Sequence, residues 1–400
     1  MSDSNKGQVI LVLNAGSSSI KFALFDAAAS PPSRSPLWRG KVDGITGPTP
    51  VISENDREGQ PLALDASQPY HDALEQIRDR VRRQLAGRTL KAIGHRVVHG
   101  GIKYAQPVLI DAQVLDDLKR YIPLAPLHQP FALEAIEILL RTRPGLPQVA
   151  CFDTAFHHTL PEVEKILPLP WAAWENGLRR YGFHGLSYRY QSIALGERYG
   201  ARAMGRTLVA HLGSGASLCA MHGLKSTATT MGFSALDGLM MGTRSGAMDP
   251  GAVIYLMQSR GLSLEKVSHI LYHESGLLGV SGVSSDPRAL LEVEADEPRA
   301  AMALALYVRR FVHEAGALVA ALGGLDMLVF TAGVGEHNAV LRARLCAGLR
   351  YLGLELDDAA NQANAQVISS PASQVSVVVE PTNEEWVCAL DAWQLTQATP

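Results

Sequence analysis

The stretch VILVLNAGSSSIKFALFD, residues 9–26, determines how the rest of the chain is interpreted. Its apolar residues 9–13 predict a buried strand, and residues 22–25 predict a second strand after a turn rich in glycine and serine. Small side chains and exposed backbone N–H groups suit a turn that lies against a phosphate chain. Asn14 could offer an oxygen to a metal, and Lys21 could supply a cation. For this stretch alone an ordinary hairpin turn is an equal alternative, because turns favour these residue types for conformational reasons.

The same pattern returns in RTLVAHLGSGASLCAMH, residues 206–222. Here too an apolar strand leads into a turn of glycine and serine, and a second apolar strand follows. The first turn is not a Walker A loop, which needs G-x-x-x-x-G-K-[ST] and a helix rather than a strand after it. Repetition of one supersecondary unit predicts two similar domains. Two turns of this kind suit a nucleotide triphosphate, and the second copy makes an ordinary hairpin the weaker interpretation.

The composition is that of an ordinary globular enzyme. The 400 residues suffice for two domains, and the apolar fraction is 47% with 19% charged residues. A formal net charge of −3 argues against a surface for nucleic acid or an anionic membrane. The four cysteines contain no C-x-x-C and predict isolated reduced thiols. No apolar run approaches the ~18 residues of a membrane span or forms a signal-peptide core, so a cytoplasmic location is expected.

The remaining periodicity predicts mainly helices. An amphipathic helix is expected over residues 72–85, with its arginines on a solvated face, and further helices over residues 111–121 and 130–141. Residues 27–61 are rich in proline, serine and glycine, which predicts loops and short edge strands. A long apolar stripe over residues 300–322 predicts a helix that stops at a glycine pair.

Four polar residues stand in contexts that need a chemical reason. Arg96 lies in a predicted strand, where an unpaired charge is costly, so it is either a structural ion pair or a ligand for a substrate anion. Asp153 ends a predicted strand, the place where ligands gather in α/β sheets. His184 lies between an aromatic residue and glycine at a predicted helix entrance. Arg244 lies in a loop of glycine and methionine, either as a plain surface residue or as a partly buried guanidinium directed at an anion.

Three later loops could also contribute to a site. The glycine–serine loop of residues 275–290 ends in Asp286 and Arg288 before a predicted helix. Residues 326–338 predict a strand followed by Gly-x-Gly, where bare backbone lets a flat ring or a phosphate approach closely. The acidic pair Glu384 and Glu385 could hold Mg²⁺ or favour the N-terminus of a closing helix.

In this order, the motifs closely resemble those of the acetate and propionate kinases, the acetokinase family of the sugar kinase, Hsp70 and actin superfamily. The matching segments are NAGSSSIKF, GHRVVHGG, FDTAFH, YGFHG, HLGSGAS, GLMMGTRSG, SGLLGVSG, FTAGVGE and PTNEE. The resemblance implies an α/β fold of two RNase H-like, actin-like ATPase domains flanking a nucleotide-binding cleft. The implied domains are residues 1–153 plus 385–400, and residues 154–384 with the nucleotide site and a homodimer interface.

The resemblance further implies reversible transfer of the γ-phosphoryl group of ATP to acetate, which gives acetyl phosphate and ADP. Asn14 and Glu384 would hold Mg²⁺, for which Mn²⁺ could substitute, and Lys21 would contact ATP. Arg96 would bind the substrate, Asp153 would be catalytic, and His184 and Arg244 would stabilise the transition state. The nucleotide site would be lined by His211, Leu212, Gly213, Ser214, Gly215, Asp286, Pro287, Arg288, Gly333, Val334, Gly335, Glu336 and His337. The apolar substrate pocket would be formed by Val98, Leu127, Phe183 and Ala235.

The chain departs from the family pattern at a few positions. Ser214 stands where Asn is usual and Ala247 where Asp is usual, although Asp249 is kept. Ala235 replaces a common proline beside the methyl pocket, which leaves room for propionate. A carboxylate is already ionised at neutral pH, so it needs no general base to attack. It must instead approach ATP, another anion, and two unit charges at 4 Å repel by about 4 kcal/mol at an effective dielectric near 20. The reaction therefore needs cations at the point of transfer. Two alternatives stay open. One is a non-catalytic or slow ATPase of the same fold, such as an actin-like filament subunit or an Hsp70-like binding module. The other is a kinase for butyrate or a longer acid.

Overall fold

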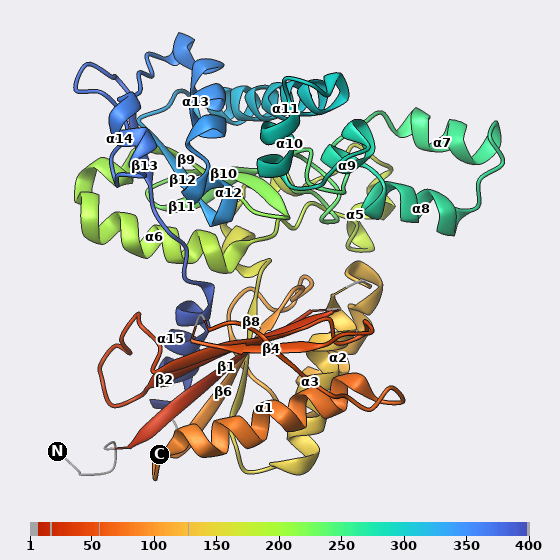
Figure 1. Ribbon diagram of the computed structural model, residues 1–400, viewed down its shortest axis with the longest axis vertical. Coiled ribbons are helices and arrows are strands. Elements are labelled where there is room, and N and C mark those ends of the chain that lie inside the picture. Colours follow the sequence, from red (N-terminus) through yellow and green to blue (C-terminus); the bar gives the residue numbers. More distant parts are fainter. Residues whose placement is uncertain (1–6, 17, 56, 127, 398–400) are drawn as a thin grey trace. The chain divides into compact units, whose positions relative to one another are not determined.

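The computed structural model describes residues 7–16, 18–55, 57–126 and 128–397, shown in Figure 1. The chain forms two compact units, each built on its own sheet. Unit 1 comprises Met1–Phe156 with Asn383–Pro400, and unit 2 comprises His157–Thr382. A mixed α/β fold with two sheets is therefore confirmed.

The sheet of unit 1 has the strand order β5-β4-β3-β2-β1-β6-β8-β7. β1 pairs antiparallel with β2 and parallel with β6, and β6 pairs parallel with β8. The predicted hairpin and the predicted short edge strands are both confirmed. The strands are β1 (Gln8–Ala15), β2 (Ser19–Asp26), β3 (Trp38–Asp43), β4 (Val51–Glu54), β5 (Gln60–Pro61), β6 (Thr89–Val97), β7 (Val108–Leu109) and β8 (Gln148–Phe152).

Alternation of side chains along the strands assigns the two faces of this sheet. Leu11, Leu13 and Ile93 belong to the hydrophobic core that includes Ile77 and Val81 of α1 (Pro69–Leu85). On the opposite face, a methyl group added to Gly94 would lie 2.9 Å from the carbonyl oxygen of Cys388 in α15 (Glu384–Gln397). The alternating pattern therefore places Asn14 and Arg96 on the α15 face. The predicted helices on this unit are confirmed as α1, α2 (Ala112–Arg120) and α3 (Gln129–Thr142).

The sheet of unit 2 has the order β11-β10-β9-β12-β13. β9 (Arg206–Leu212) and β10 (Ala216–His222) form the second predicted hairpin, with β11 (Lys225–Thr229) antiparallel beside it. β12 (Met327–Thr331) runs parallel to β9, and β13 (Ser376–Val379) runs parallel to β12. The order β3-β2-β1-β6-β8 of unit 1 has the same sequence of antiparallel and parallel pairings, so the predicted repeat of one supersecondary unit is confirmed.

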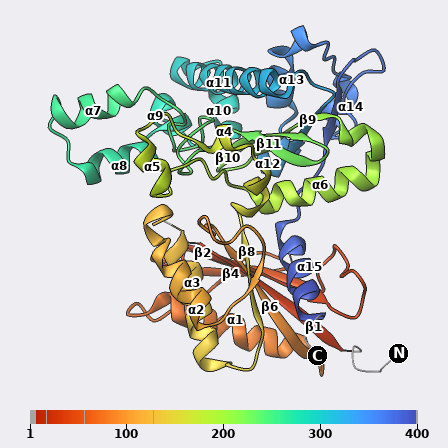
Figure 2. The same cartoon turned by 180° about the vertical axis from the view of Figure 1, so that it is seen from behind.

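Helices of unit 2 pack on this sheet or extend from it (Figure 2). The longest, α11 (Pro298–Leu322), ends at Gly323 with φ +75°, as the glycine pair predicted. The others are α4 (Glu162–Lys165), α5 (Trp171–Glu175), α6 (Gly185–Tyr199), α7 (Pro250–Gln258), α8 (Leu264–His273), α9 (Gly276–Ser281), α10 (Pro287–Val293), α12 (Ala332–His337), α13 (Ala339–Ala347) and α14 (Asp358–Gln362).

The cysteines, the arginines of α1 and the apolar helices were also the subject of predictions. All four cysteines are free and buried, as predicted. The expected solvated arginine face of α1 is wrong for Arg80, whose side chain is only 16% exposed because its Nε donates to Glu54 Oε1 at 3.1 Å. Among the described residues, no helix is both long enough and apolar enough to cross a bilayer.

Candidate active site

A first charge cluster lies where β1, β6 and β8 end in unit 1. Since these strands are parallel, Asn14, Arg96 and Asp153 arrive at the same edge of the sheet. Arg96 donates from Nη2 and Nε to Asp153 Oδ2 at 2.6 and 3.1 Å, and from Nη1 to Asn14 Oδ1 at 3.1 Å. Glu384, the first residue of α15, lies with Oε2 at 3.8 Å from Arg96 Nε. The structure thus brings four predicted site residues together.

The electrostatics of this cluster favour an added cation. Burial lowers the pKa of Arg96, but the carboxylates of Asp153 and Glu384 outweigh it, so this pKa stays above its ordinary value. Burial raises the pKa of Glu384 to about 7; Arg96 opposes this effect, and Asp153 adds to it. Asp153 is 2% exposed, and within the described residues its Oδ1 has no hydrogen-bond partner. One guanidinium therefore faces two carboxylates, and one buried carboxylate oxygen lacks a partner.

The oxygens of this cluster fit Mg²⁺. The candidate ligands are the amide oxygen of Asn14 and the carboxylate of Glu384, both of the hard type that Mg²⁺ prefers. The unpartnered oxygen of Asp153 lies in the same cluster and can accept from a water. In the part of the chain that the structure describes, no three His, Cys, Asp or Glu side chains gather as a metal cage. Mg²⁺ is ordinarily held by one or two carboxylates together with water and substrate phosphates, which agrees with this sparse donor set.

The first hairpin places Lys21 beside this cluster. Lys21 is exposed and lies opposite Asn14 in the β1–β2 register. The turn is fastened by Gly16, whose N–H donates to Ser19 O at 2.8 Å and whose carbonyl accepts from the Tyr70 hydroxyl. An exposed ammonium next to a fixed turn can contact a phosphate group.

A second cluster in unit 2 is built on an unusual backbone turn. His184, the residue before α6, has φ +57°, and Gly182 has φ +74°. A methyl group added to Gly182 would lie 2.5 Å from the ring of buried His157, so only glycine fits there. His157 Nε2 hydrogen-bonds Phe183 O at 2.9 Å and fixes the turn further. The predicted loop-to-helix boundary at His184 is confirmed.

Hydroxyl groups orient the two histidines of this cluster. His184 Nδ1 hydrogen-bonds Ser217 Oγ at 2.8 Å, and the Tyr188 hydroxyl lies 2.5 Å from the same oxygen. His211 Nδ1 hydrogen-bonds Ser187 Oγ at 2.9 Å, and Ser187 in turn accepts from Thr382 at 2.9 Å. The two imidazole rings stack with centroids 4.2 Å apart.

The sequence interpretation missed these orienting hydroxyls. They lie inside the segments HLGSGAS, GLSY and PTN, so the motifs contained the signal. Which hydroxyl faces which imidazole depends on distant segments, and a linear pattern does not contain that pairing.

His184 and Arg244 face one point beside the second hairpin turn. A methyl group added to Gly215 would lie 3.2 Å from His184 Nε2 and 3.6 Å from Arg244 Nη1. Arg244 donates to the carbonyl of Ala235 at 3.1 Å, and no carboxylate lies within ion-pair distance of it among the described residues. Burial lowers the pKa of Arg244. A half-buried guanidinium with no carboxylate is suited to bind an anion.

The loop that carries Arg244 is irregular, as predicted, and its shape is held by glycine. Gly276 has φ +64°, and a methyl group added to it would lie 2.1 Å from Met241 O. The backbone of α9 also donates to this loop, from Leu277 N to Met241 O at 2.9 Å. The close approach of α9 therefore fixes the backbone of the loop that carries Arg244.

Some of the residues predicted to bind the nucleotide lie around the second hairpin. His211 pairs with Thr331 in the β9–β12 register, and a methyl group added to Gly213 would lie 3.7 Å from Ala332 Cβ. The turn of Gly213, Ser214 and Gly215, preceded by buried Leu212, is thus adjacent to α12, which contains Gly333, Val334, Gly335, Glu336 and His337. Space around Gly333 is open, since no atom lies within 4 Å of an added methyl group. Glu336 instead has a structural contact, because Oε1 accepts from the N–H groups of Ala332 and Thr382 at 2.7 and 3.1 Å.

The segment Asp286–Arg288 caps α10. Asp286 accepts from the Arg288 N–H at 2.9 Å and pairs with its side chain at 2.6 Å, while Pro287 is buried. The Arg288 side chain is 76% exposed, so it is accessible to a ligand. Leu290 of α10 packs in one hydrophobic cluster with Leu341, and Val334 packs against that cluster.

The predicted apolar pocket is accounted for only in part. Phe183 is buried beside His184, and half-buried Ala235 holds Arg244 through its carbonyl. Val98 is half-buried and belongs to unit 1. Leu127 lies outside the described residues.

Comparison with known proteins identifies the family. The model of the acetokinase family matches residues 9–390. Acetate kinase from Rhodopseudomonas palustris is 47% identical over 393 residues, which cover 97% of this chain and 98% of the relative. The crystal structure of Porphyromonas gingivalis acetate kinase matches with a TM-score of 0.87 at 37% identity, over 97% of this chain and 99% of that chain. A propionate kinase structure from Francisella tularensis matches with a TM-score of 0.89 at 35% identity, over the same shares. The chain therefore belongs to the acetokinase family.

Proposed function

We propose that this protein is an acetate kinase, which transfers the γ-phosphoryl group of ATP to acetate and forms acetyl phosphate and ADP. The observation that carries the proposal is the full-length similarity to acetate kinases, at 47% identity over 97% of the chain. The two charge clusters support it, because each provides groups that an anionic acceptor and a phosphoryl group require.

Arg96 is the group that would bind the acetate carboxylate. Its guanidinium is held by Asp153 and Asn14, so its orientation is fixed before the substrate arrives. A carboxylate is ionised at neutral pH, so its oxygen can attack phosphorus without a general base. Asp153 is then a positioning residue: it orients Arg96 through Oδ2, and its Oδ1 would accept from a water.

His184 and Arg244 would stabilise the charge that spreads over the transferring phosphoryl group. His184 Nδ1 is engaged by Ser217, which directs Nε2 toward the point that Arg244 also faces. Phosphoryl transfer depends on positioning and charge stabilisation, and an arginine in this role is worth about 10³ to 10⁵ in rate. The attack would be direct and in line, with no phosphorylated enzyme on the path.

Asn14 and Glu384 would hold Mg²⁺, with Mn²⁺ as a possible substitute, and Lys21 would contact the phosphates of ATP. When bound, the metal neutralises charge on the β- and γ-phosphate oxygens. His211, the hairpin turn after it and the start of α12 would form the nucleotide-binding wall of unit 2.

A hydroxylamine trap tests the proposal. With ATP, Mg²⁺ and acetate, the enzyme should yield acetyl hydroxamate, and omission of any one of them should abolish the product. Hydrolysis of ATP without hydroxamate would indicate a slow ATPase of the same fold and would contradict the proposal. A chemically competent phosphorylated enzyme would refute the in-line step alone.

The range of acids is part of the proposal. Ala235 in place of a bulkier residue leaves room for one more methylene, and the match to a propionate kinase structure supports activity on propionate. We expect kcat/KM to fall from acetate to propionate and again to butyrate. A preference for butyrate would instead indicate a kinase for longer acids. A cytoplasmic homodimer that joins through unit 2 is proposed by family resemblance.

A further inference from the structure

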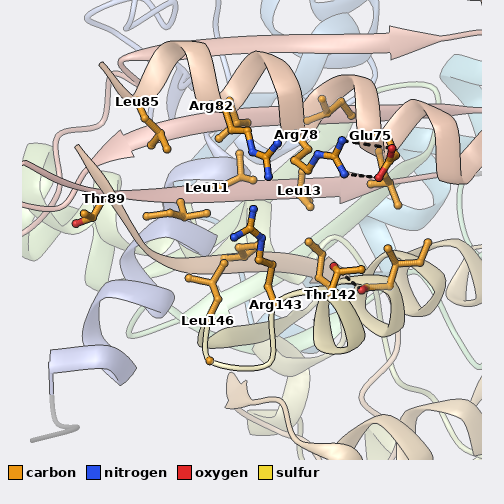
Figure 3. Close-up of a pocket in the computed structure, with 18 of the residues that line it drawn as sticks. Leu11, Leu13, Glu75, Arg78, Arg82, Leu85, Thr89, Thr142, Arg143 and Leu146 are labelled. Atoms are coloured by element: carbon orange, nitrogen blue, oxygen red, sulfur yellow. Dashed lines mark hydrogen bonds and ion pairs between the residues drawn. The ribbon is translucent and has the colours of Figure 1, made fainter. Parts of the chain in front are cut away.

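Unit 1 contains a large groove on the face of its sheet opposite α15. Its volume is about 830 Å³, and it lies between α1, the strands β1 and β6, and the end of α3 with the turn that follows (Figure 3). The floor is apolar: Leu11, Leu13 and Ile93 from the strands lie beneath it and are buried. The half-buried Leu85 and Leu146 at its edges keep apolar surface open. Val81 and Leu139 supply apolar walls from the two helices. None of these residues belongs to either charge cluster, and within unit 1 Asn14 and Arg96 lie on the other face of the sheet.

The rim of this groove is positively charged. Four arginines and a single acidic residue, Glu75, line it. Two of the arginines are compensated by acids of α1: Arg78 pairs with Glu75 and Asp79, and Arg82 lies 3.7 Å from Asp79. The other two, Arg88 and Arg143, form no ion pair within the described part of the chain.

Two guanidiniums converge across the mouth of the groove. Figure 3 shows that Arg82 from α1 and Arg143 from the turn after α3 point toward each other above the apolar floor. Like charges brought together repel, and an anion between them would relieve that repulsion. Both side chains are exposed, so a carboxylate can reach them from solvent.

We propose that this groove binds a free medium-chain fatty-acid anion. Its carboxylate would lie between Arg82 and Arg143. Its hydrocarbon chain would cover the half-buried leucines that line the groove, Leu85, Leu139 and Leu146. Charge complementarity favours this ligand, because an apolar groove with a cationic rim fits a molecule with one anionic end and one apolar chain. This proposal is independent of the kinase activity, because it involves none of the residues of either charge cluster.

Binding of the hydrocarbon chain to the groove can be tested by isothermal titration calorimetry of the whole protein. The ligands are octanoate, decanoate and dodecanoate, each below its micelle concentration. Each added methylene should tighten binding by up to about fourfold. Leu146→Trp, at a half-buried position on the groove edge, should weaken decanoate binding at least tenfold by filling the groove. An affinity independent of chain length would overturn the proposal, as would unchanged binding in a folded Leu146→Trp variant.

Arginine variants test whether the rim of the groove binds the carboxylate. Arg82→Ala and Arg143→Ala should each weaken decanoate binding about fivefold, and decanol should bind at least tenfold more weakly than decanoate. Arg83→Ala is the matched control, because this exposed arginine of α1 does not line the groove. Equal binding of decanol, or an equal loss in Arg83→Ala, would overturn the proposal. Retention of the protein on phosphatidylglycerol vesicles without binding of monomeric decanoate would indicate a lipid surface instead and would also overturn it.

Discussion

Replacement of Arg244 by alanine separates catalysis from stability more cleanly than any other change in the two clusters. Arg244 has no carboxylate partner among the described residues and donates one protein–carbonyl hydrogen bond, to Ala235 O at 3.1 Å. Loss of such a bond costs about 0.5–1.5 kcal/mol, and removal of a partly buried charge offsets part of this cost. The free energy of unfolding should therefore change by about 1 kcal/mol or less.

The effect on turnover should be far larger. If the guanidinium stabilises the transferring phosphoryl group, kcat should fall by about 10³ to 10⁵, which corresponds to about 4–7 kcal/mol of transition-state stabilisation. Arg244→Lys keeps the charge but loses the planar fork, so it should recover only part of the rate. The KM values for acetate and ATP should change less than kcat, because the interaction forms fully only in the transition state.

The assay is the hydroxamate trap at saturating acetate and MgATP, combined with urea denaturation of the same preparations. Arg202→Ala, at an exposed arginine of unit 2 that belongs to neither cluster, serves as the control and should leave both quantities unchanged. A folded Arg244→Ala enzyme with near-normal kcat would refute the assigned role. A loss of several kcal/mol in stability would show that the contacts of Arg244 have been misjudged.

Three further changes follow from the other contacts. Asp153→Asn should lower kcat by up to about 100-fold and raise the KM for acetate, because it loosens Arg96; an unchanged KM for acetate would contradict this positioning role. Ser217→Ala should lower kcat about 10- to 100-fold with little change in KM, since His184 loses the partner of Nδ1, whereas Ser192→Ala in the same unit should have no effect. Burial lowers the pKa of His95 to about 4, so the unfolded state binds more protons below pH 6.5. The stability that this neutral histidine contributes is therefore complete above pH 6.5 and should fall by about 1.4 kcal/mol per pH unit toward pH 4, a slope that His95→Gln should reduce in urea titrations.

Much of the fold could be predicted because its signals are local. The apolar runs of both hairpins, the long stripe of α11 and its glycine stop are contained in short windows, and the structure confirms each of them. The parallel strands then bring Arg96 and Asp153 together without further information, since both lie at the carboxyl ends of neighbouring strands.

The rest depends on pairings between distant segments. Arg80 reads as a surface residue on its helix, but Glu54 of β4 lies beside it in the fold. The orienting contact of Ser217 with His184 spans 33 residues, and that of Thr382 with Ser187 spans 195. The cationic groove combines arginines of α1 with Arg143 beyond α3, and no single amphipathic helix pattern contains that combination.

The most direct test of the account is the identity of the product formed from acetate and MgATP, followed by phosphorus NMR. An acetate kinase should form acetyl phosphate in equal amount to ADP and should show no turnover above background when acetate is left out. Release of inorganic phosphate at the same rate with and without acetate would contradict it.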